Sequence, residues 1–302
     1  MDLSGFADRL ERVGISVLRE APMSRHTSFK IGGPVDVMVL PKSCEEVKTV
    51  MGELSLAGEE PLIIGNGTNL LVTDSPLHRV VVKTYNGLGA ISAGGETEVV
   101  AGSGAMMSRV AVSAMERGLA GMEFAHGIPG TMGGAIAMNA GAYGGQMANI
   151  VDSVNFIDEE GNVQCRKKDE LDFSYRHSVF SGNKYVILAA TLRLERGDRG
   201  TIKKKMDELM HKRRESQPLE MASAGSTFKR PPKGYAAALI EQAGLKGYTA
   251  GDAQVSQKHS GFVVNLGGAS FDDVRKVMDH VTDTVYARFG IMLEREVRVI
   301  EA

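Results

Sequence analysis

One segment with a composition suited to ligand binding is the glycine-rich stretch from Gly118 to Gly145. Nine of its residues are glycine, and Glu123 is its single charged residue. Glycine loses much backbone entropy on folding, so such a run indicates a main chain that must approach something closely. Bare backbone N–H groups form a natural cradle for phosphate or pyrophosphate. Taken alone, the segment is equally compatible with a ligand cradle and with a tightly packed Gly/Ala crossing in a core.

Three further segments carry polar groups that could take part in binding or catalysis. GNGTN (65–69) follows a short apolar run and offers amide and hydroxyl groups beside its glycines. AGSTFKRP (224–231) holds Ser226 between a glycine and two cations, either as a turn residue or as a hydroxyl fixed for proton transfer. Near the C-terminus, Val297 and Val299 would face one side of a strand and Glu294, Glu296 and Arg298 the other. This charged face is either exposed or catalytic.

Several common chemistries are excluded by missing motifs. The dipeptide Gly-Lys never occurs, so a Walker-A phosphate loop is absent, and no GxGxxG supports a standard Rossmann fold. HExxH, CxxC and GxSxG are also missing, which removes the usual zinc, dithiol and serine-hydrolase sites. The seven histidines are scattered, so no metal site is expected.

Composition restricts the partners and the compartment. The 302 residues suffice for two or three domains, and 35 basic residues against 37 acidic ones give a net charge of −2. This balance argues against general binding to nucleic acid or membrane surfaces. The two cysteines cannot build a disulfide framework, and neither a signal peptide nor a membrane-length apolar run is visible. We therefore expect a cytoplasmic location; the sequence leaves the oligomeric state open.

The elements that would position these residues are those of small α/β units. Alternating valines predict a strand at 35–39, and Ser43 with Glu46 predicts a capping box at the start of a helix. Further predicted elements are strands at 61–64, 80–83, 98–101 and 185–194, a helix at 105–117, a hairpin at 151–166, and a strand at 261–265. One helix is predicted to start near Ile202, a short one to end at Gly244, and one of about 18 residues to start at Phe271. A final strand is predicted at 291–300.

The domain organisation follows from these elements. The charged, glycine-bearing stretch Glu195–Gly200 predicts a linker, and Lys203, Lys204 and Lys205 beyond it predict a solvated helix face. We expect segments 1–83, 84–199 and 200–290, followed by a strand at 291–302 that carries Glu296 and returns to the first part of the chain.

Six motifs in one order carry a resemblance that covers almost the whole chain. They are HTSFKIGGP (26–34), IIGNGTNLLV (63–72), EFAHGIPGTMGGAIAMNAGAYG (123–144), FSYRHSVF (173–180), AGSTFKRP (224–231) and LEREVRVI (293–300). Together they resemble the UDP-N-acetylenolpyruvylglucosamine reductase family, in its shorter second form. The resemblance implies an α+β protein: a non-Rossmann FAD-binding fold of two small α/β subdomains, of the PCMH or vanillyl-alcohol-oxidase type, plus a third α+β substrate-binding domain.

The resemblance also implies a set of site residues. The catalytic residues would be Arg176, Ser226 and Glu296. FAD would be bound by Gly65, Asn66, Gly67, Thr68, Asn69, Ile128, Pro129, Gly130, Thr131, Gly133, Gly134, Asn139, Ala140, Gly141 and Ala142. Substrate would be bound by Tyr175, Arg213, Lys229, Arg230, Lys258 and His259, whose cations suit a diphosphate. No metal is implied.

The implied reaction belongs to bacterial peptidoglycan synthesis. Hydride would pass from NADPH to flavin N5 and then to the enolpyruvyl ether, and Ser226 would protonate the product carbon. Arg176 would hold the substrate carboxylate, and Glu296 would be protonated or hydrogen-bonded through Arg176. Two alternatives stay open: an FAD-dependent oxidase of the same fold, tethered through His26 or His126, and a nucleotide-binding module without catalysis.

Overall fold

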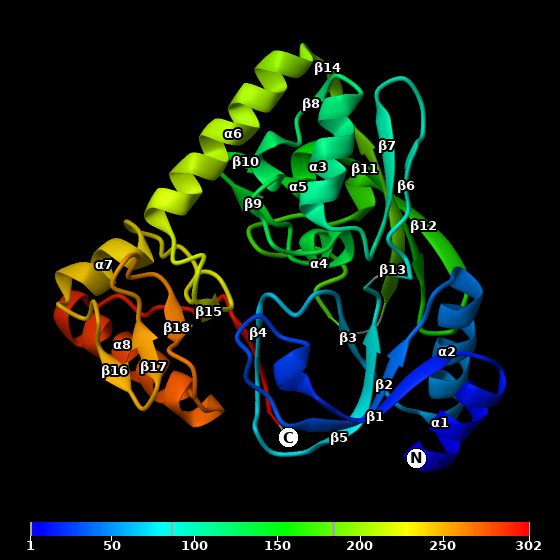
Figure 1. Ribbon diagram of the computed structural model, residues 1–302, viewed down its shortest axis with the longest axis horizontal. Helices are drawn as coiled ribbons and strands as arrows, with labels where there is room; N and C mark the ends of the chain where they lie inside the picture. Colours follow the sequence, from blue (N-terminus) through cyan, green and yellow to red (C-terminus); the bar gives the residue numbers. More distant parts are fainter. Residues whose placement is uncertain (1, 86, 183–184, 302) are drawn as a thin grey trace. The chain divides into compact units, whose positions relative to one another are not determined.

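The computed structural model describes residues 2–85, 87–182 and 185–301, and its chain forms two compact units. Unit 1 comprises Met1–Glu20, Asp36–Asn66 and Arg79–Lys212, and unit 2 comprises Ala21–Val35, Gly67–His78 and Arg213–Ala302. Each unit is therefore assembled from three stretches of chain, which Figure 1 allows the reader to follow by colour. The division into three domains and a C-terminal strand stays a prediction.

The first part of unit 1 is a four-stranded sheet covered by two helices. The strand order is β1 (Ser16–Pro22), β2 (Pro34–Leu40), β5 (Leu77–Lys83) and β3 (Leu62–Ile64), with β3 parallel to β5. The helices α1 (Leu3–Arg12) and α2 (Cys44–Ala57) lie side by side in Figure 1. Their apolar faces share one core with the sheet because both helices are amphipathic.

The start of α2 agrees with its predicted cap, with one difference. The Ser43 hydroxyl accepts a hydrogen bond from the Glu46 backbone N–H at 3.1 Å, as expected. The Glu46 carboxylate, however, accepts from the Lys42 N–H at 2.7 Å, one residue before the position that a capping box would use.

The second part of unit 1 is a five-stranded antiparallel sheet. Its order is β12 (Val163–Lys167), β11 (Val151–Ile157), β13 (Val186–Arg193), β7 (Glu98–Gly102) and β6 (Ile91–Ala93), so the predicted hairpin and the strand near 185–194 are confirmed. The helices α3 (Met107–Glu116), α4 (Met132–Ala137) and α5 (Met147–Ile150) contribute to the same apolar core. Short 3-10 turns occur at η1 (Met23–Arg25), η2 (Glu123–Ala125) and η3 (Lys168–Glu170).

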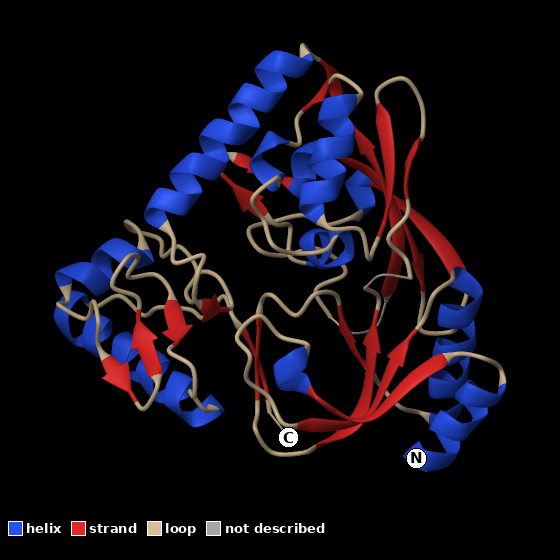
Figure 2. Cartoon of the chain, in the orientation of Figure 1, coloured by secondary structure: helices blue, strands red, loops and turns tan. Residues whose placement is uncertain are grey.

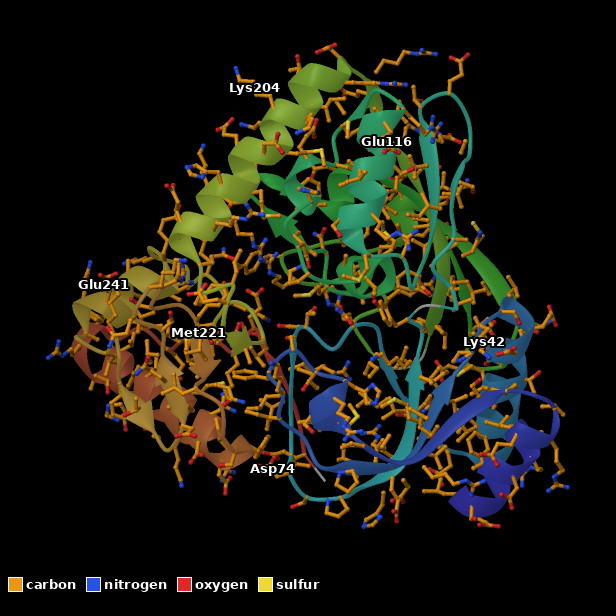
Figure 3. The ribbon with its side chains drawn as sticks, viewed as in Figure 1. Lys42, Asp74, Glu116, Lys204, Met221 and Glu241 are labelled. Carbon is orange, nitrogen blue, oxygen red and sulfur yellow. The ribbon has the colours of Figure 1, made fainter. Side chains whose placement is uncertain are left out.

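The predicted linker Glu195–Gly200 is wrong. Two of its residues form β14 (Glu195–Arg196), which pairs antiparallel with β8 (Leu119–Ala120), and Gly197 N–H donates to the Gly118 carbonyl at 2.8 Å. Charge and glycine content do not reveal a two-residue ladder whose partner lies far away in the sequence. The helix α6 (Arg199–Ser216) follows directly, and its lysines 203–205 are exposed as predicted; Lys204 is labelled in Figure 3.

Unit 2 is built on a four-stranded sheet in the order β15 (Ala222–Ser223), β18 (Val263–Asn265), β17 (Ala253–Val255) and β16 (Thr249–Ala250). The helices α7 (Ala236–Gln242) and α8 (Phe271–Phe289) pack with it. The apolar stripe predicted on α8 is buried from Phe271 to Val285, but Phe289, predicted to belong to the same stripe, is 37% exposed. Asp74, labelled in Figure 3, accepts a hydrogen bond from the Phe271 N–H at 2.7 Å at the start of α8.

The C-terminal strand is shorter than predicted. Only β19 (Arg298–Ile300) forms a ladder, parallel to β4 (Leu70–Val72), while Arg295 makes an isolated bridge with Phe228. Figure 2 shows both helices and strands, the mixed content of an α+β protein. Among the described residues, no helix combines the length and hydropathy needed to cross a membrane.

Candidate functional site

The two predicted cofactor loops meet inside unit 1. The strand β3 ends at Ile64, and the next residue, Gly65, lies so close to Thr131 that a β-carbon there would overlap the Thr131 hydroxyl. Asn66 Nδ2 also donates to the Pro129 carbonyl at 3.4 Å. The remaining residues of the first loop, Gly67, Thr68 and Asn69, belong to unit 2.

The second loop is fastened to the chain that follows β7. Met107 N–H donates to the Gly130 carbonyl at 3.0 Å, and Gly133 N–H donates to the Ser103 carbonyl at 2.8 Å. A β-carbon on Gly133 would stand 2.9 Å from that of Ser103, closer than side chains pack. Glycine is therefore needed here for close packing of backbone, which is the second of the two interpretations that the sequence left open.

Two buried hydroxyl groups in this region support the first interpretation. Ser103 and Thr131 are each 1% exposed, and neither hydroxyl has a hydrogen-bond partner within the described part of the chain. An unsatisfied buried polar group costs about 1–3 kcal/mol, so such groups are normally paired. FAD carries many hydrogen-bond acceptors, and these hydroxyls, Thr131 beside Gly65 and Ser103 beside Gly133, fit such a cofactor. The glycine-rich segment thus both packs tightly and offers donors to a ligand.

The other predicted cofactor residues lie along the same segment. Ile128, Pro129 and Gly130 form the approach to α4, Gly133 and Gly134 lie in its first turn, and Asn139–Ala142 follow its last turn into β9 (Gly141–Ala142). β9 pairs with β10 (Gly145–Gln146). His126, one of the two residues considered for a covalent tether, also has a buried Nδ1 without a partner among the described residues.

Arg176 lies at the tip of a tight turn in unit 1. Ser174 and His177 form an isolated antiparallel bridge, with reciprocal N–H to carbonyl bonds of 3.1 and 3.2 Å. The Arg176 backbone has φ of 57°, in the left-handed region, and its guanidinium lies 5.2 Å from the Tyr175 ring centroid. Its Nη2 reaches the Gly141 carbonyl at 3.5 Å, so the predicted catalytic arginine lies beside the predicted cofactor segment.

Ser226 and Glu296 are brought together in unit 2. Glu296 N–H donates to the Thr227 carbonyl, and Lys229 N–H donates to the Glu294 carbonyl, both at 2.8 Å. The segments 226–229 and 294–297 therefore run antiparallel as neighbours. Both Ser226 and Glu296 are half-buried.

Thr227 fixes this arrangement, and the sequence analysis missed it. Its side chain is 1% exposed; its hydroxyl accepts from Val263 N–H at 2.9 Å, and its own N–H donates to the Gly261 carbonyl at 2.8 Å. One residue thus joins β18, the Ser226 segment and the Glu296 segment. The available signal was a threonine directly after Ser226, a residue type that often bonds to backbone.

Asn69, predicted to bind the cofactor, bonds to the Glu296 segment within unit 2. Its Nδ2 donates to the Glu296 carbonyl at 3.0 Å, and its own carbonyl accepts from Arg298 N–H at 3.0 Å. These two bonds extend the β4–β19 ladder and fix the backbone on both sides of Val297. Asn69 therefore also has a role in placing Glu296.

Three of the predicted substrate-binding cations, Lys229, Arg230 and Lys258, contact other groups of the protein. Lys229 pairs with the Glu294 carboxylate, and Lys258 Nζ donates to the Arg214 carbonyl at 2.6 Å. The Arg230 guanidinium stacks 4.2 Å from the Tyr235 ring centroid. Arg213 lies on α6, and Tyr175, which belongs to unit 1, is 51% exposed. A diphosphate grip by these cations stays a prediction.

His259 is partly buried, unlike the exposed Lys258 before it. Its ring lies edge-on to Phe262 with centroids 5.1 Å apart, and its Nδ1 accepts from Gly261 N–H at 3.2 Å. Burial lowers the pKa of the His259 imidazole from its ordinary value, because the charged form is poorly solvated there. Among the described residues no group of three or more potential metal ligands occurs.

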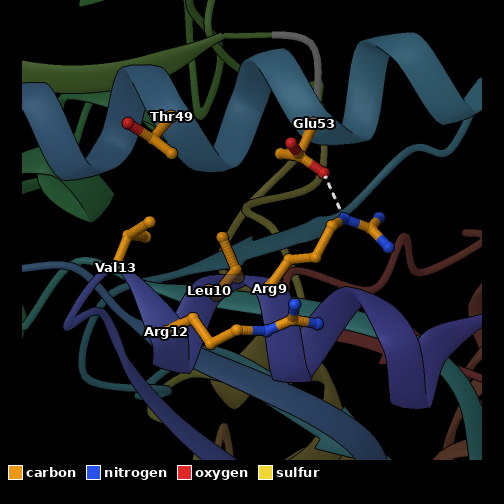
Figure 4. A pocket seen from close by; sticks show the side chains of 6 residues that line it. All are labelled: Arg9, Leu10, Arg12, Val13, Thr49 and Glu53. Atoms are coloured by element: carbon orange, nitrogen blue, oxygen red, sulfur yellow. Dashed lines mark hydrogen bonds and ion pairs between the residues drawn. The ribbon is translucent and has the colours of Figure 1, made fainter.

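A surface pocket between α1 and α2 is separate from these residues. Figure 4 shows its lining side chains, with Arg9 Nε and Glu53 Oε2 joined at 2.8 Å. None of the predicted site residues lines it. It is an exposed groove between two helices of unit 1.

Comparison with known families and structures agrees with this geometry. Residues 35–165 match the family model described as "FAD binding domain", and residues 217–300 match "UDP-N-acetylenolpyruvoylglucosamine reductase, C-terminal domain". These matches confirm the FAD-binding domain and the α+β class expected from the sequence.

Individual relatives cover nearly the whole chain. Proteins named "UDP-N-acetylenolpyruvoylglucosamine reductase" from Caldanaerobacter subterraneus subsp. tengcongensis and Clostridium novyi are 47% and 48% identical, over 92% of this chain and 92% and 90% of theirs. The crystal structure of the reductase from Thermus caldophilus is 31% identical, with a TM-score of 0.83, and covers 95% of this chain and 100% of its own.

Proposed function

Because the chain belongs to the UDP-N-acetylenolpyruvoylglucosamine reductase family, we propose that it reduces UDP-N-acetylenolpyruvylglucosamine to UDP-N-acetylmuramate in bacterial peptidoglycan synthesis. NADPH is the reductant, and FAD is the bound cofactor. The carbon–carbon double bond of the enolpyruvyl ether gains one hydride and one proton, which leaves a lactyl ether.

FAD, when bound, supplies the relay that takes hydride from NADPH and delivers it to the substrate. Gly65 and Gly133 let the backbone come close, and the hydroxyls of Ser103 and Thr131 donate hydrogen bonds. These four residues lie in one unit, so they hold the cofactor as a preorganised set.

Three side chains act on the substrate in this proposal. Arg176 binds the carboxylate of the enolpyruvyl group and stabilises the negative charge that develops there when hydride arrives. Ser226 protonates the carbon that bears the ether oxygen, a general-acid step typically worth about 10²–10⁴-fold. Glu296 is itself protonated or hydrogen-bonded in this proposal, because its bare carboxylate would repel that charge.

The observation that carries the proposal is the pairing of the Ser226 and Glu296 segments. Their N–H to carbonyl bonds of 2.8 Å bring together two residues that are far apart in the sequence. Thr227 and Asn69 hold the two backbones in this register through four more hydrogen bonds of 2.8–3.0 Å. This backbone pairing supports the proposal because it holds the Ser226 and Glu296 segments as neighbours within unit 2.

The test is the visible spectrum of the purified protein, followed through the two half-reactions. Flavin bands should bleach with NADPH and return with the enolpyruvyl sugar. Ser226→Ala should leave bleaching near normal and slow the return about 10²-fold or more. Ser223→Ala, on the same segment, is the control and should leave both phases unchanged. Equal slowing of both phases in Ser226→Ala would show that the serine is not the proton donor.

A second measurement separates this function from a tethered oxidase. Acid precipitation should leave the yellow colour in the supernatant, because the proposed FAD is not covalently attached. A yellow pellet would point to a covalent bond through His26 or His126. A protein that is colourless and takes up no FAD would refute the proposed function.

A further inference from the structure

Asn139 uses its side-chain amide within the protein. It is 2% exposed and follows α4 with φ of 44°. Its Nδ2 donates to the Ser174 carbonyl at 2.9 Å and to Gln146 Oε1 at 3.3 Å, and its Oδ1 accepts from Ala148 N–H at 2.9 Å. Its backbone N–H donates to the Ile136 carbonyl at 3.1 Å. Both amide N–H groups and the backbone N–H are therefore engaged.

The Ser174 carbonyl is the important acceptor. It also accepts from His177 N–H at 3.2 Å, the bond that closes the turn around Tyr175 and Arg176. A carbonyl oxygen has two lone pairs, so both bonds can form at once. Asn139 thus bonds to the atom that defines the turn from which Arg176 projects.

A second set of bonds anchors the other end of the same turn. The hydroxyls of Ser178 and Ser181 both donate to the Ala137 carbonyl at 2.9 Å, and Ser178 is fully buried. Residues 137–139 therefore hold the 174–178 turn from both sides. A left-handed backbone at a non-glycine residue costs about 1–3 kcal/mol and persists only where its surroundings over-determine it, which describes Arg176 here.

We propose that Asn139 is a positioning residue that acts on the reaction through Arg176, and that it is not a ligand of FAD. The proposal rests on the proposed function for the role of Arg176, while the anchoring of the turn stands independently of it. The segment after α4 has two tasks: its glycines border the cofactor loops, and its asparagine sets the direction of the arginine.

Asn139→Asp is the first test, because it keeps the shape and the Oδ1 acceptor but replaces both amide donors. The second half-reaction should slow about 10–10²-fold, since small misplacements of a binding group have effects of this size. The dissociation constant of FAD and the rate of flavin reduction by NADPH should change less than about twofold. Gln146→Ala, which removes only the 3.3 Å bond, should leave both half-reactions near wild type.

A double-mutant cycle decides whether Asn139 acts through Arg176. In an Arg176→Ala background, Asn139→Asp should slow the second half-reaction less than about twofold further, because its target is already gone. If Asn139→Asp slowed the second half-reaction by the same factor in the Arg176→Ala background as in the wild type, the proposal would be overturned. A tenfold weaker FAD affinity with a normal second half-reaction would also overturn it and make Asn139 a cofactor ligand.

Hydrogen exchange tests the anchoring without any substrate. In Asn139→Asp the amides of Ser174 and His177 should exchange faster than in the wild type, while those of β11 and β13 should not change. Unchanged exchange at the turn would refute the anchoring even if the proposed reaction were correct. An inactive wild type with faster exchange in the variant would refute the reaction alone.

Should Asn139→Asp not fold, Asn139→Ala removes the same two amide donors without burying a charge. It should then show the faster exchange and the selectively slowed second half-reaction. Normal behaviour in both measurements would refute the proposal.

Discussion

The Gly65 backbone lies directly against the Thr131 hydroxyl, with no room between them for even a methyl group. The contact joins the residue after β3 to the residue before α4, and both residues belong to unit 1. Because Thr131 Oγ1 has no partner among the described residues, this contact leaves a hydroxyl ready to donate where the two loops meet. The close approach of Thr131 is therefore a reason in itself for glycine at position 65.

Gly65→Ala should weaken FAD binding at least about tenfold, because Thr131 must move to make room for the new methyl group. The measurement is the dissociation constant of FAD, from flavin fluorescence on titrating apoprotein. Gly52→Ala is the matched control, since nothing lies within 4 Å of a β-carbon at Gly52 in α2. It should leave FAD affinity unchanged and stabilise the protein by about 0.5–1 kcal/mol. Equal affinity in both variants would contradict the assigned contact.

Thr131→Val should separate the cofactor role of the hydroxyl from its cost to the fold. Valine has the same shape without the unpaired polar atom, so the apoprotein should unfold at the same or a higher temperature. FAD should bind about 3–10-fold more weakly, the loss expected for one hydrogen bond of about 0.5–1.5 kcal/mol. Thermal melting of the apoprotein and FAD titration give the two values. A destabilised apoprotein with normal FAD affinity would show that the hydroxyl serves the fold instead.

Ser103→Ala should behave in the same way. Its hydroxyl is as deeply buried and equally without a partner within the described residues. Combining it with Thr131→Val tests whether both hydroxyls contact one ligand, because the losses in FAD affinity should then deviate from additivity. Two variants that leave FAD affinity unchanged would remove these residues from the cofactor site.

Thr227→Val should damage both stability and catalysis. It leaves the buried Val263 N–H without an acceptor, which costs about 1–3 kcal/mol. The Ser226 and Glu296 segments lose a shared anchor, so the return of flavin colour with substrate should slow while bleaching by NADPH does not. Urea unfolding and stopped-flow absorbance measure the two effects. Thr227→Ser, which retains the hydroxyl, should recover most of both.

His259 should make the protein less stable in acid. Burial lowers its pKa in the folded state below the ordinary value of 6.5. Above pH 6.5 the imidazole is neutral in both states and contributes no pH dependence; below it, the unfolded chain binds a proton more readily, so stability falls as the pH falls through that range. His259→Gln should have a flatter melting temperature between pH 8 and about pH 5. Parallel curves for the two proteins would show that His259 does not cause this loss.

Much of the fold was predictable because its signals are local. The alternating valines before Pro41, the cap at Ser43 and the apolar stripe from Phe271 each depend on the geometry of one element. The motifs around Gly65, Thr131, Arg176, Ser226 and Glu296 were likewise visible as residue types in a fixed order. The family could be identified from them before any contact was known.

The contacts between distant segments were not predictable from such patterns. Glu195–Gly200 has the composition of a linker, and the two residues that form β14 are too few to show a periodicity. The C-terminal strand is shorter than predicted because residues 294–296 bond to the 227–229 segment, so only Arg298–Ile300 pair with β4. No sequence pattern points to Thr227, and the resemblance implies only cofactor binding for Asn69. In the structure both residues bond to the Glu296 backbone.

The sequence by itself determined which residue types this protein has for cofactor binding and catalysis, since glycine, hydroxyl, guanidinium and carboxyl groups are chemical identities. Only the tertiary structure decided what each of them touches. Gly65 packs against Thr131, Thr227 bonds to Glu296, and Asn139 bonds to the turn that carries Arg176. Each of these contacts closes a long loop of chain. Loop closure depends on how all the elements pack together, so no local pattern encodes it.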